Sequence, residues 1–138
     1  MLDTWRKVIA ELKTPFAIGG KSMGGRMASL IADDVQAAGL LCLGYPFVGV
    51  GGKQNPKRTA HLATVKTPTL ICQGTRDPMG NREFVTALSL SKKIRLSWAE
   101  DGDHDLKPRK ASGFTHAQNL AAALDAAGRF LEGLSPHK

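Results

Sequence analysis

The stretch FAIGGKSMGGRMASLIADDV, residues 16–35, decides the fold of this chain. It opens with a short apolar run, which predicts a buried strand at 16–19, and continues at 24–35 with apolar residues at helical spacing. The turn between them reads Gly-x-Ser-x-Gly at Gly20, Ser22 and Gly24. A serine on such a strand-to-helix turn is a nucleophile elbow, where the residues two before and two after the serine come close together. We therefore expect glycine to be required at both flanking positions.

Strand and helix patterns alternate along the rest of the sequence. Three further apolar runs predict strands, at 38–45, 67–74 and 94–99. Three segments with helical spacing predict helices, at 3–13, 81–91 and 115–134, the last with a core face of Leu120, Leu124, Ala127 and Leu131. Loops are expected at 49–58 and 101–114. This order predicts an α/β fold, a single domain over residues 1–138 in which helices cover both faces of a parallel sheet of about four strands.

Chemically active residues follow three of the predicted strands. Ser22 follows the first, Asp77 follows the run 67–74, and His104 follows the run 94–99. The carboxyl ends of parallel strands meet at one edge of a sheet, so these side chains are expected to gather there. A serine hydroxyl needs a base to take its proton, and a histidine oriented by a carboxylate supplies one. The amide of Met23, at the start of the next helix, is placed to bind an oxyanion.

Other interpretations of these segments stay open. Gly20-Lys21-Ser22 also ends a phosphate-binding loop, which would indicate nucleotide binding, but that motif needs a glycine at position 15, where Pro15 stands. Asp103 and Asp105 compete with Asp77 as the partner of His104. The acidic run 101–105 lacks the remaining ligands of a calcium loop. Three other histidines are expected to be surface or cap residues: His61, His116 and His137.

The composition argues against several classes of partner. The chain has 138 residues with 19 Lys+Arg and 12 Asp+Glu, a net charge of +7, but its basic residues are scattered and do not alternate with aromatics, so nucleic-acid binding is not expected. The longest uncharged apolar run, 37–50, is too short for a membrane span, and the charged opening residues 1–13 lead us to expect no signal peptide. Cys42 and Cys72 lie in apolar runs, which predicts buried reduced thiols and a cytoplasmic location. Zinc-type spacings are absent, so no metal and no cofactor are expected.

Four segments together resemble a known family: GGKSMGGRMAS at 19–29, LGYPF at 43–47, TPTLICQGTRDP at 67–78 and DGDHDLKPRK at 101–110. They are similar to small bacterial serine α/β-hydrolases near the dienelactone hydrolases, a group that includes testis-expressed hydrolase-like proteins and a subunit of the NSL chromatin complex. The resemblance implies that Ser22, Asp77 and His104 form a catalytic triad acting on a small acyl substrate. Dienelactone hydrolase itself uses a cysteine nucleophile where this chain has Ser22, which argues against dienelactones as substrates; an ester or related acyl compound is expected.

This sequence differs from the group at its amino terminus. Its members carry an N-terminal half-domain with further strands and a His-Gly-rich loop that donates a second oxyanion amide, and nothing here matches it. We therefore expect the C-terminal half of the α/β-hydrolase fold, with the elbow strand at a sheet edge. Loss of one oxyanion donor typically lowers the rate about a hundred- to thousandfold. An alternative function is a weakly active or inactive core that serves as an interaction module or homodimer through that edge.

Overall fold

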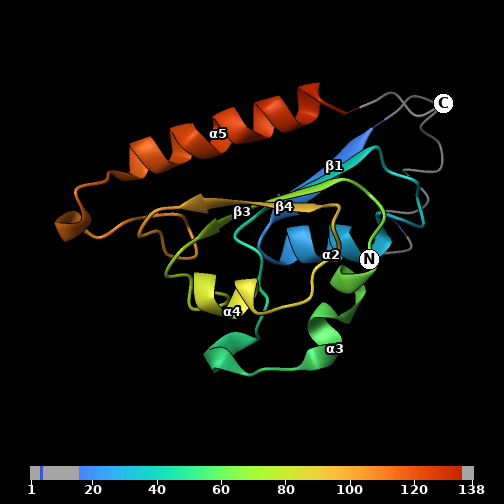
Figure 1. Cartoon of the computed structure of the whole chain (residues 1–138), viewed down its shortest axis with the longest axis horizontal. Coiled ribbons are helices and arrows are strands. Elements are labelled where there is room, and N and C mark those ends of the chain that lie inside the picture. The colour runs from blue at the N-terminus through green and yellow to red at the C-terminus, as the bar shows by residue number, and fades with distance from the viewer. Residues whose placement is uncertain (1–3, 5–15, 135–138) are drawn as a thin grey trace.

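A parallel sheet forms the centre of the computed structural model, which describes residue 4 and residues 16–134 (Figure 1). Its strands are β1 (Ala17–Lys21), β2 (Gly39–Leu43), β3 (Thr69–Gly74) and β4 (Ile94–Ala99), in the order β1-β2-β3-β4. All three pairings are parallel. The predicted fold class is confirmed, and the bounds of β4 are those expected from the sequence. The predicted helix at 3–13 lies outside the described residues.

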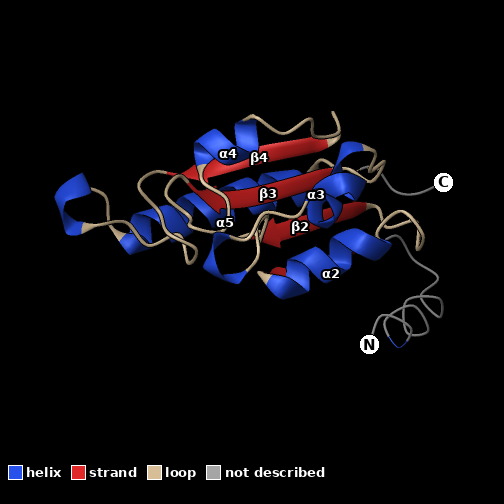
Figure 2. Cartoon of the chain, turned by 90° about the horizontal axis from the view of Figure 1, so that it is seen from below, coloured by secondary structure: helices blue, strands red, loops and turns tan. Residues whose placement is uncertain are grey.

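Helices cover both faces of this sheet. Figures 1 and 2 show α2 (Met23–Ile31), α3 (Pro56–Thr59) and α4 (Arg82–Thr86) on one side and α5 (His116–Glu132) alone on the other. The predicted loop at 49–58 contains α3 and a single 3₁₀ turn, and α4 is shorter than the predicted helix at 81–91. No helix in the described part of the chain is long and apolar enough to cross a membrane.

Each face of the sheet has its own apolar core. On the α2 side the core contains Tyr45, Phe47 and Ile71, all at most 1% exposed, and β3 is buried at every position. On the α5 side Leu70 and Leu106 pack with alanines of the helix. This two-sided burial explains why the sequence of β3 is a continuous apolar run rather than an alternating one.

The two cysteines lie one in each core. Cys42 and Cys72 are buried free thiols, which confirms the prediction that they are buried and reduced. Burial raises the pKa of the Cys42 thiol to about 12 and that of the Cys72 thiol to about 11. Both thiols are therefore protonated and unreactive near neutral pH.

The predicted core face of α5 is wrong for its three leucines and confirmed for Ala127. Leu120, Leu124 and Leu131 are 41%, 71% and 44% exposed, whereas Ala123 and Ala127 are buried. Small side chains let the helix axis approach the sheet closely, and this close packing turns the leucine stripe outward. The buried Asn119 fixes the rotation, because its Nδ2 donates to the carbonyls of Glu100 and Leu106 at 3.0 Å each.

Candidate active site

The elbow connects β1 to α2 through a strained serine. Ser22 has φ 53° and ψ −120°, a conformation that residues with a side chain rarely adopt. Its N–H donates to the carbonyl of Leu43 at 2.8 Å, which pins the turn to the neighbouring strand. A Cβ at Gly20 would lie 2.7 Å from the carbonyl carbon of Gly24 and 2.8 Å from the nitrogen of Gly25. Glycine is therefore required at position 20, as the motif predicts.

The second glycine requirement falls one residue later than expected. A Cβ at Gly24 would meet no atom within 4 Å, so the steric reason given for glycine at this position is wrong. A Cβ at Gly25 would instead lie 2.7 Å from the carbonyl oxygen of Gly20 and 3.2 Å from Cβ of Cys42. The first turn of α2 places position 25 against the sheet and position 24 toward solvent.

The three predicted side chains lie in one hydrogen-bonded line. Ser22 Oγ is 2.8 Å from His104 Nε2, and His104 Nδ1 is 2.8 Å from Asp77 Oδ2. Ser22 lies at the carboxyl end of β1, Asp77 in the loop after β3 and His104 in the loop after β4. The geometry suits a histidine that accepts the serine proton at Nε2 while Nδ1–H donates to the carboxylate.

The Asp77 carboxylate is wholly buried in this arrangement. Its side chain has no exposed surface, and its Oδ1 accepts the N–H of Met79 at 2.8 Å. Burial raises the pKa of Asp77, and the hydrogen bonds from His104 and the Met79 amide oppose that rise. These hydrogen-bond donors stabilise the charged form of the buried carboxylate and orient it toward the imidazole of His104.

The Met23 amide occupies the first turn of α2 beside Ser22. As the first residue of the helix, Met23 has no intrahelical acceptor for its N–H. The positive end of the helix dipole lies at the same point. The turn after β2 offers no free amide from Gly44 or Tyr45 as a second donor. The Gly44 N–H donates to the carbonyl of Cys72, and the Tyr45 N–H donates to the side-chain oxygen of Gln73.

A network of charged residues joins the loops that carry Asp77 and His104. The Asp101 carboxylate accepts from Arg109 Nη2 at 2.6 Å and forms an ion pair with Arg76 at 3.2 Å. Its backbone N–H donates to the hydroxyl of Thr75 at 2.9 Å. The Arg109 guanidinium beside it holds the pKa of Asp101 well below its usual range. Asp101 therefore acts as the link between the loop after β3 and the loop after β4.

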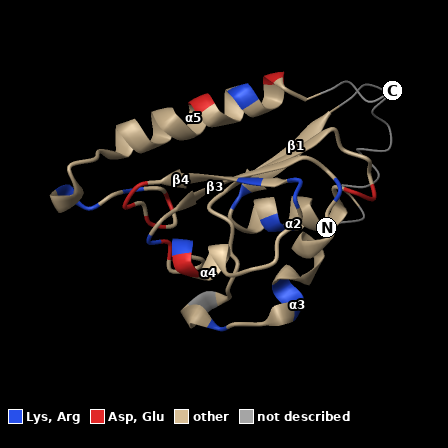
Figure 3. Cartoon of the chain, in the orientation of Figure 1, with Lys and Arg blue, Asp and Glu red and all other residues tan. Residues whose placement is uncertain are grey.

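The other acids of this loop have structural partners of their own. Figure 3 shows the acidic positions that gather after β4. Asp103 Oδ1 accepts the N–H groups of Asp105 and Lys107, and Asp105 forms an ion pair with Lys21 at 2.8 Å. Asp77, rather than either of these competitors, is the carboxylate in contact with His104.

Two hydrogen-bonded side chains were missed by sequence reasoning, Gln73 and His61. Gln73, in the middle of the apolar run of β3, is fully buried and donates to Asp77 Oδ2 at 3.1 Å. The expectation that His61 is only a surface or cap residue is wrong, because its Nε2 lies 2.9 Å from Ser29 Oγ and 3.3 Å from the hydroxyl of Tyr45. Neither had a sequence signal. The partners of His61 are distant along the chain, and Gln73 stands in an apolar run that shows no role for a polar side chain.

Comparisons with known proteins agree with this architecture. The model of a family described as an alpha/beta hydrolase domain matches residues 1–132. Among solved structures, the esterase domain of a Rhodothermus marinus protein is 17% identical with a TM-score of 0.59, over 90% of this chain and 64% of that one. An alpha-beta serine hydrolase homologue from Coxiella burnetii is 20% identical with a TM-score of 0.58, over 86% of this chain and 49% of that one.

At 17% and 20% identity, the two solved structures show a similarity of fold alone. The chain spans less than two thirds of the length of either solved structure. No curated protein matches it.

Proposed function

The chain belongs to the alpha/beta hydrolase domain family, and from this premise we propose that it is a serine hydrolase cleaving an ester or a related acyl compound. The observation that carries the proposal is the continuous line Ser22–His104–Asp77, with both contacts at 2.8 Å. Hydrolysis through such a triad requires no cofactor. Ser22, His104 and Asp77 are the proposed catalytic residues, and Met23 is the proposed oxyanion donor.

In the first half of the proposed reaction the acyl group passes to Ser22. Ser22 Oγ attacks the carbonyl carbon while His104 Nε2 takes the hydroxyl proton, which forms a tetrahedral oxyanion. The C–O bond to the alcohol then breaks, and His104 returns the proton to the departing oxygen. Asp77 holds the Nδ1–H and stabilises the imidazolium that exists between these two transfers.

Water reverses this sequence in the second half. His104 takes a proton from a water molecule, whose oxygen attacks the acyl carbon bound to Ser22. The bond to Oγ breaks, Ser22 regains its proton from His104, and a carboxylic acid leaves. Within residues 16–134, the Met23 amide is the one donor that we propose to stabilise the two oxyanions, so we expect slow turnover. A single missing donor typically costs about a hundred- to thousandfold in rate.

The finer identity of the substrate is also a proposal. The segments around Ser22, Asp77 and His104 support a place near the dienelactone-hydrolase-like group. A serine in place of the cysteine of dienelactone hydrolase favours simple esters over dienelactones. A cytoplasmic location is proposed on the two buried free thiols.

A fluorophosphonate probe tests the nucleophile directly, because it bonds covalently only to an activated serine. We expect labelling of the wild-type chain, no labelling of Ser22→Ala, and strongly reduced labelling of His104→Ala. Ser89→Ala is the matched control, since Ser89 is exposed and remote from the elbow. A folded wild-type chain that stays unlabelled, or labels equally after Ser22→Ala, would refute the proposal.

A second candidate function rests on the position of β1. In the part of the chain that the structure describes, β1 pairs only with β2 and forms one end of the sheet. An unpaired strand edge is a template for another chain, which favours a homodimer or interaction module. Sedimentation at increasing concentration tests this: a dimer supports it, and a monomer throughout the range contradicts it.

A further inference from the structure

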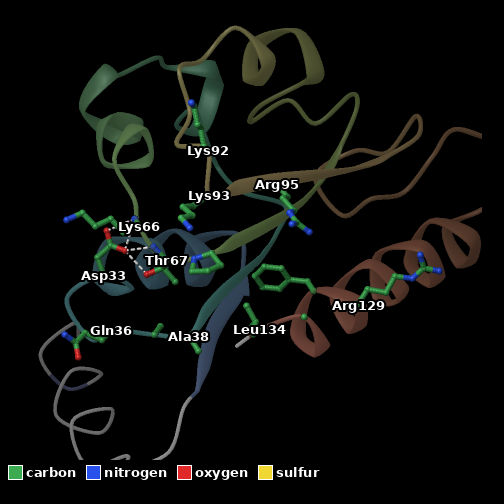
Figure 4. A pocket seen from close by; sticks show the side chains of 14 residues that line it. Asp33, Gln36, Ala38, Lys66, Thr67, Lys92, Lys93, Arg95, Arg129 and Leu134 are labelled. Atoms are coloured by element: carbon green, nitrogen blue, oxygen red, sulfur yellow. Dashed lines mark hydrogen bonds between the residues drawn. The ribbon is translucent and has the colours of Figure 1, made fainter. Parts of the chain in front are cut away.

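A broad groove opens at the end of the sheet opposite the proposed active site (Figure 4). Its volume is about 910 Å³, and its walls include the residues that enter β2, β3 and β4 and the last turns of α5. Ser22, Asp77 and His104 lie at the carboxyl ends of strands five or six residues long. At about 3.3 Å a residue, the two sites are roughly 20 Å apart. The groove is therefore separate from the chemistry proposed above.

Positive charge dominates this groove. Five cationic side chains from three segments line it, all of them exposed: Lys66, then Lys92, Lys93 and Arg95, and Arg129. Within the described residues, only Arg129 has an ion-pair partner, Asp125, at 3.1 Å. The one carboxylate in the lining is that of Asp33. Five cations against one acid leave a formal charge of +4, which is more than half of the +7 of the whole chain.

Among the described residues, Asp33 forms no ion pair with a groove lysine, although its charge offsets one of the five cations. Its oxygens accept the backbone N–H groups of Lys66 and Thr67 at 2.9 and 2.8 Å and the hydroxyl of Thr67 at 2.7 Å (Figure 4). These bonds hold the turn that enters β3. The same bonds leave the lining with no free amide at that turn to bind a compact phosphate, so the groove offers dispersed side-chain charge.

Apolar residues form the floor between the charges. Pro68, Phe130 and Leu134 line the groove together with Ala37 and Ala38. A ligand that fits therefore carries several negative charges and some apolar groups along its length. We propose that this groove binds an acidic segment of a partner protein in which apolar side chains alternate with carboxylates.

Two simpler explanations account for only part of the arrangement. Lysines protect exposed edge strands from aggregation, which would explain Lys92, Lys93 and Arg95 on and before β4. It does not explain Lys66 and Arg129, which lie on other elements and face the same groove. A single-stranded nucleic acid would bind most favourably where its bases can stack on an aromatic face.

The aromatic side chain in the lining does not supply such a face. Phe130 packs against the core under α5, where it is half-buried among Leu70 and Cys72. The cations are thus combined with an apolar floor rather than with a stacking platform. This combination favours a polypeptide over an oligonucleotide.

Fluorescence anisotropy with a short labelled peptide of alternating glutamate and leucine tests the proposal. We expect saturable binding to the wild-type chain that weakens with added salt. The variant Lys92→Gln/Lys93→Gln/Arg95→Gln should raise Kd about tenfold or more. The matched control Lys53→Gln/Lys57→Gln/Lys110→Gln removes the same charge from exposed positions outside the groove and should change Kd less than about twofold.

Circular dichroism melting confirms that both triple variants fold. No binding to the wild-type chain, or equal weakening in the two triple variants, overturns the proposal, because attraction to net charge alone would act equally in both. A labelled oligothymidine that binds more tightly than the peptide and loses affinity in the groove variant also overturns it, in favour of nucleic acid.

Discussion

Gln73 Nε2 and Asp77 Oδ2 lie 3.1 Å apart in a fully buried contact at the carboxyl end of β3. The same amide nitrogen donates to the carbonyls of Tyr45 and Gly80 at 3.0 Å each, and Oε1 accepts the N–H of Tyr45 at 2.7 Å. One side chain thus ties the loop after β2, the turn after β3 and the acid that faces His104. The proposed site depends on this glutamine as a positioning residue.

Replacing Gln73 with leucine tests this dependence. The change leaves buried polar groups of Tyr45 and Gly80 without partners, and it should lower the free energy of unfolding by about 2–4 kcal/mol. Fluorophosphonate labelling of the folded variant should slow, because Asp77 loses a donor that orients it. Urea unfolding and labelling rates measure the two effects. Gln54→Leu, at an exposed loop position, is the control, and similar values for both variants would contradict the assignment.

Gly44 should be essential because the histidine loop rests against it. Its φ is +63°, and a Cβ there would lie 2.5 Å from the carbonyl oxygen of His104. Gly44→Ala should therefore displace His104 and reduce labelling more than about tenfold, whereas backbone strain alone costs about 1–2 kcal/mol. Gly51→Ala isolates that strain, since Gly51 has φ +77° and open space around it. Equal labelling of the two variants would show that the contact with His104 is unimportant.

The meeting of Ser22, Asp77 and His104 was predictable because each residue carries a local signal. Ser22, Asp77 and His104 each follow an apolar run long enough to read as a strand, and a parallel sheet brings the ends of such strands together. Gly20 was predictable for the same reason, since the turn itself brings it against the residues after the serine. Local pattern and sheet topology together thus specify the meeting point of the three side chains.

The features that were missed depend on contacts remote in sequence. On α5, both the leucines and the stripe of Asn119, Ala123 and Ala127 have helical spacing, and the distance between helix and sheet decides which is buried. Hydrophobicity favours the leucines, whereas close packing selects the alanines. Gln73 is similarly hidden, because a polar residue in an apolar run shows its role only when its partners are placed.

The environment of His61 predicts that the free energy of unfolding falls in mild acid. Burial lowers its pKa below the ordinary 6.5, and the charge of Arg26 lowers it further. Below about pH 6.5 the unfolded chain therefore takes up a proton that the folded chain refuses, so folding stability falls as the pH falls. His61→Gln should flatten this decline in urea unfolding between about pH 7.5 and 5.5. His116→Gln, at the start of α5, is the control, and equal slopes in both variants would rule out His61 as the source.

Asp101 should hold the loops that carry Asp77 and His104 together through its charge. Asp101→Asn removes the ion pairs to Arg109 and Arg76 and should lower both Tm and the labelling of Ser22. Asp125→Asn, which breaks the exposed pair with Arg129 on α5, should change neither appreciably.

The pH dependence of stability separates the effect of the Asp101 charge from the effect of its packing. Arg109 holds the pKa of Asp101 below the ordinary 3.8, so the unfolded chain is protonated first and the stabilisation is lost as the pH falls below that value. The stability difference between wild type and Asp101→Asn should therefore shrink on acidification, and a difference that stays constant would assign the effect to packing instead.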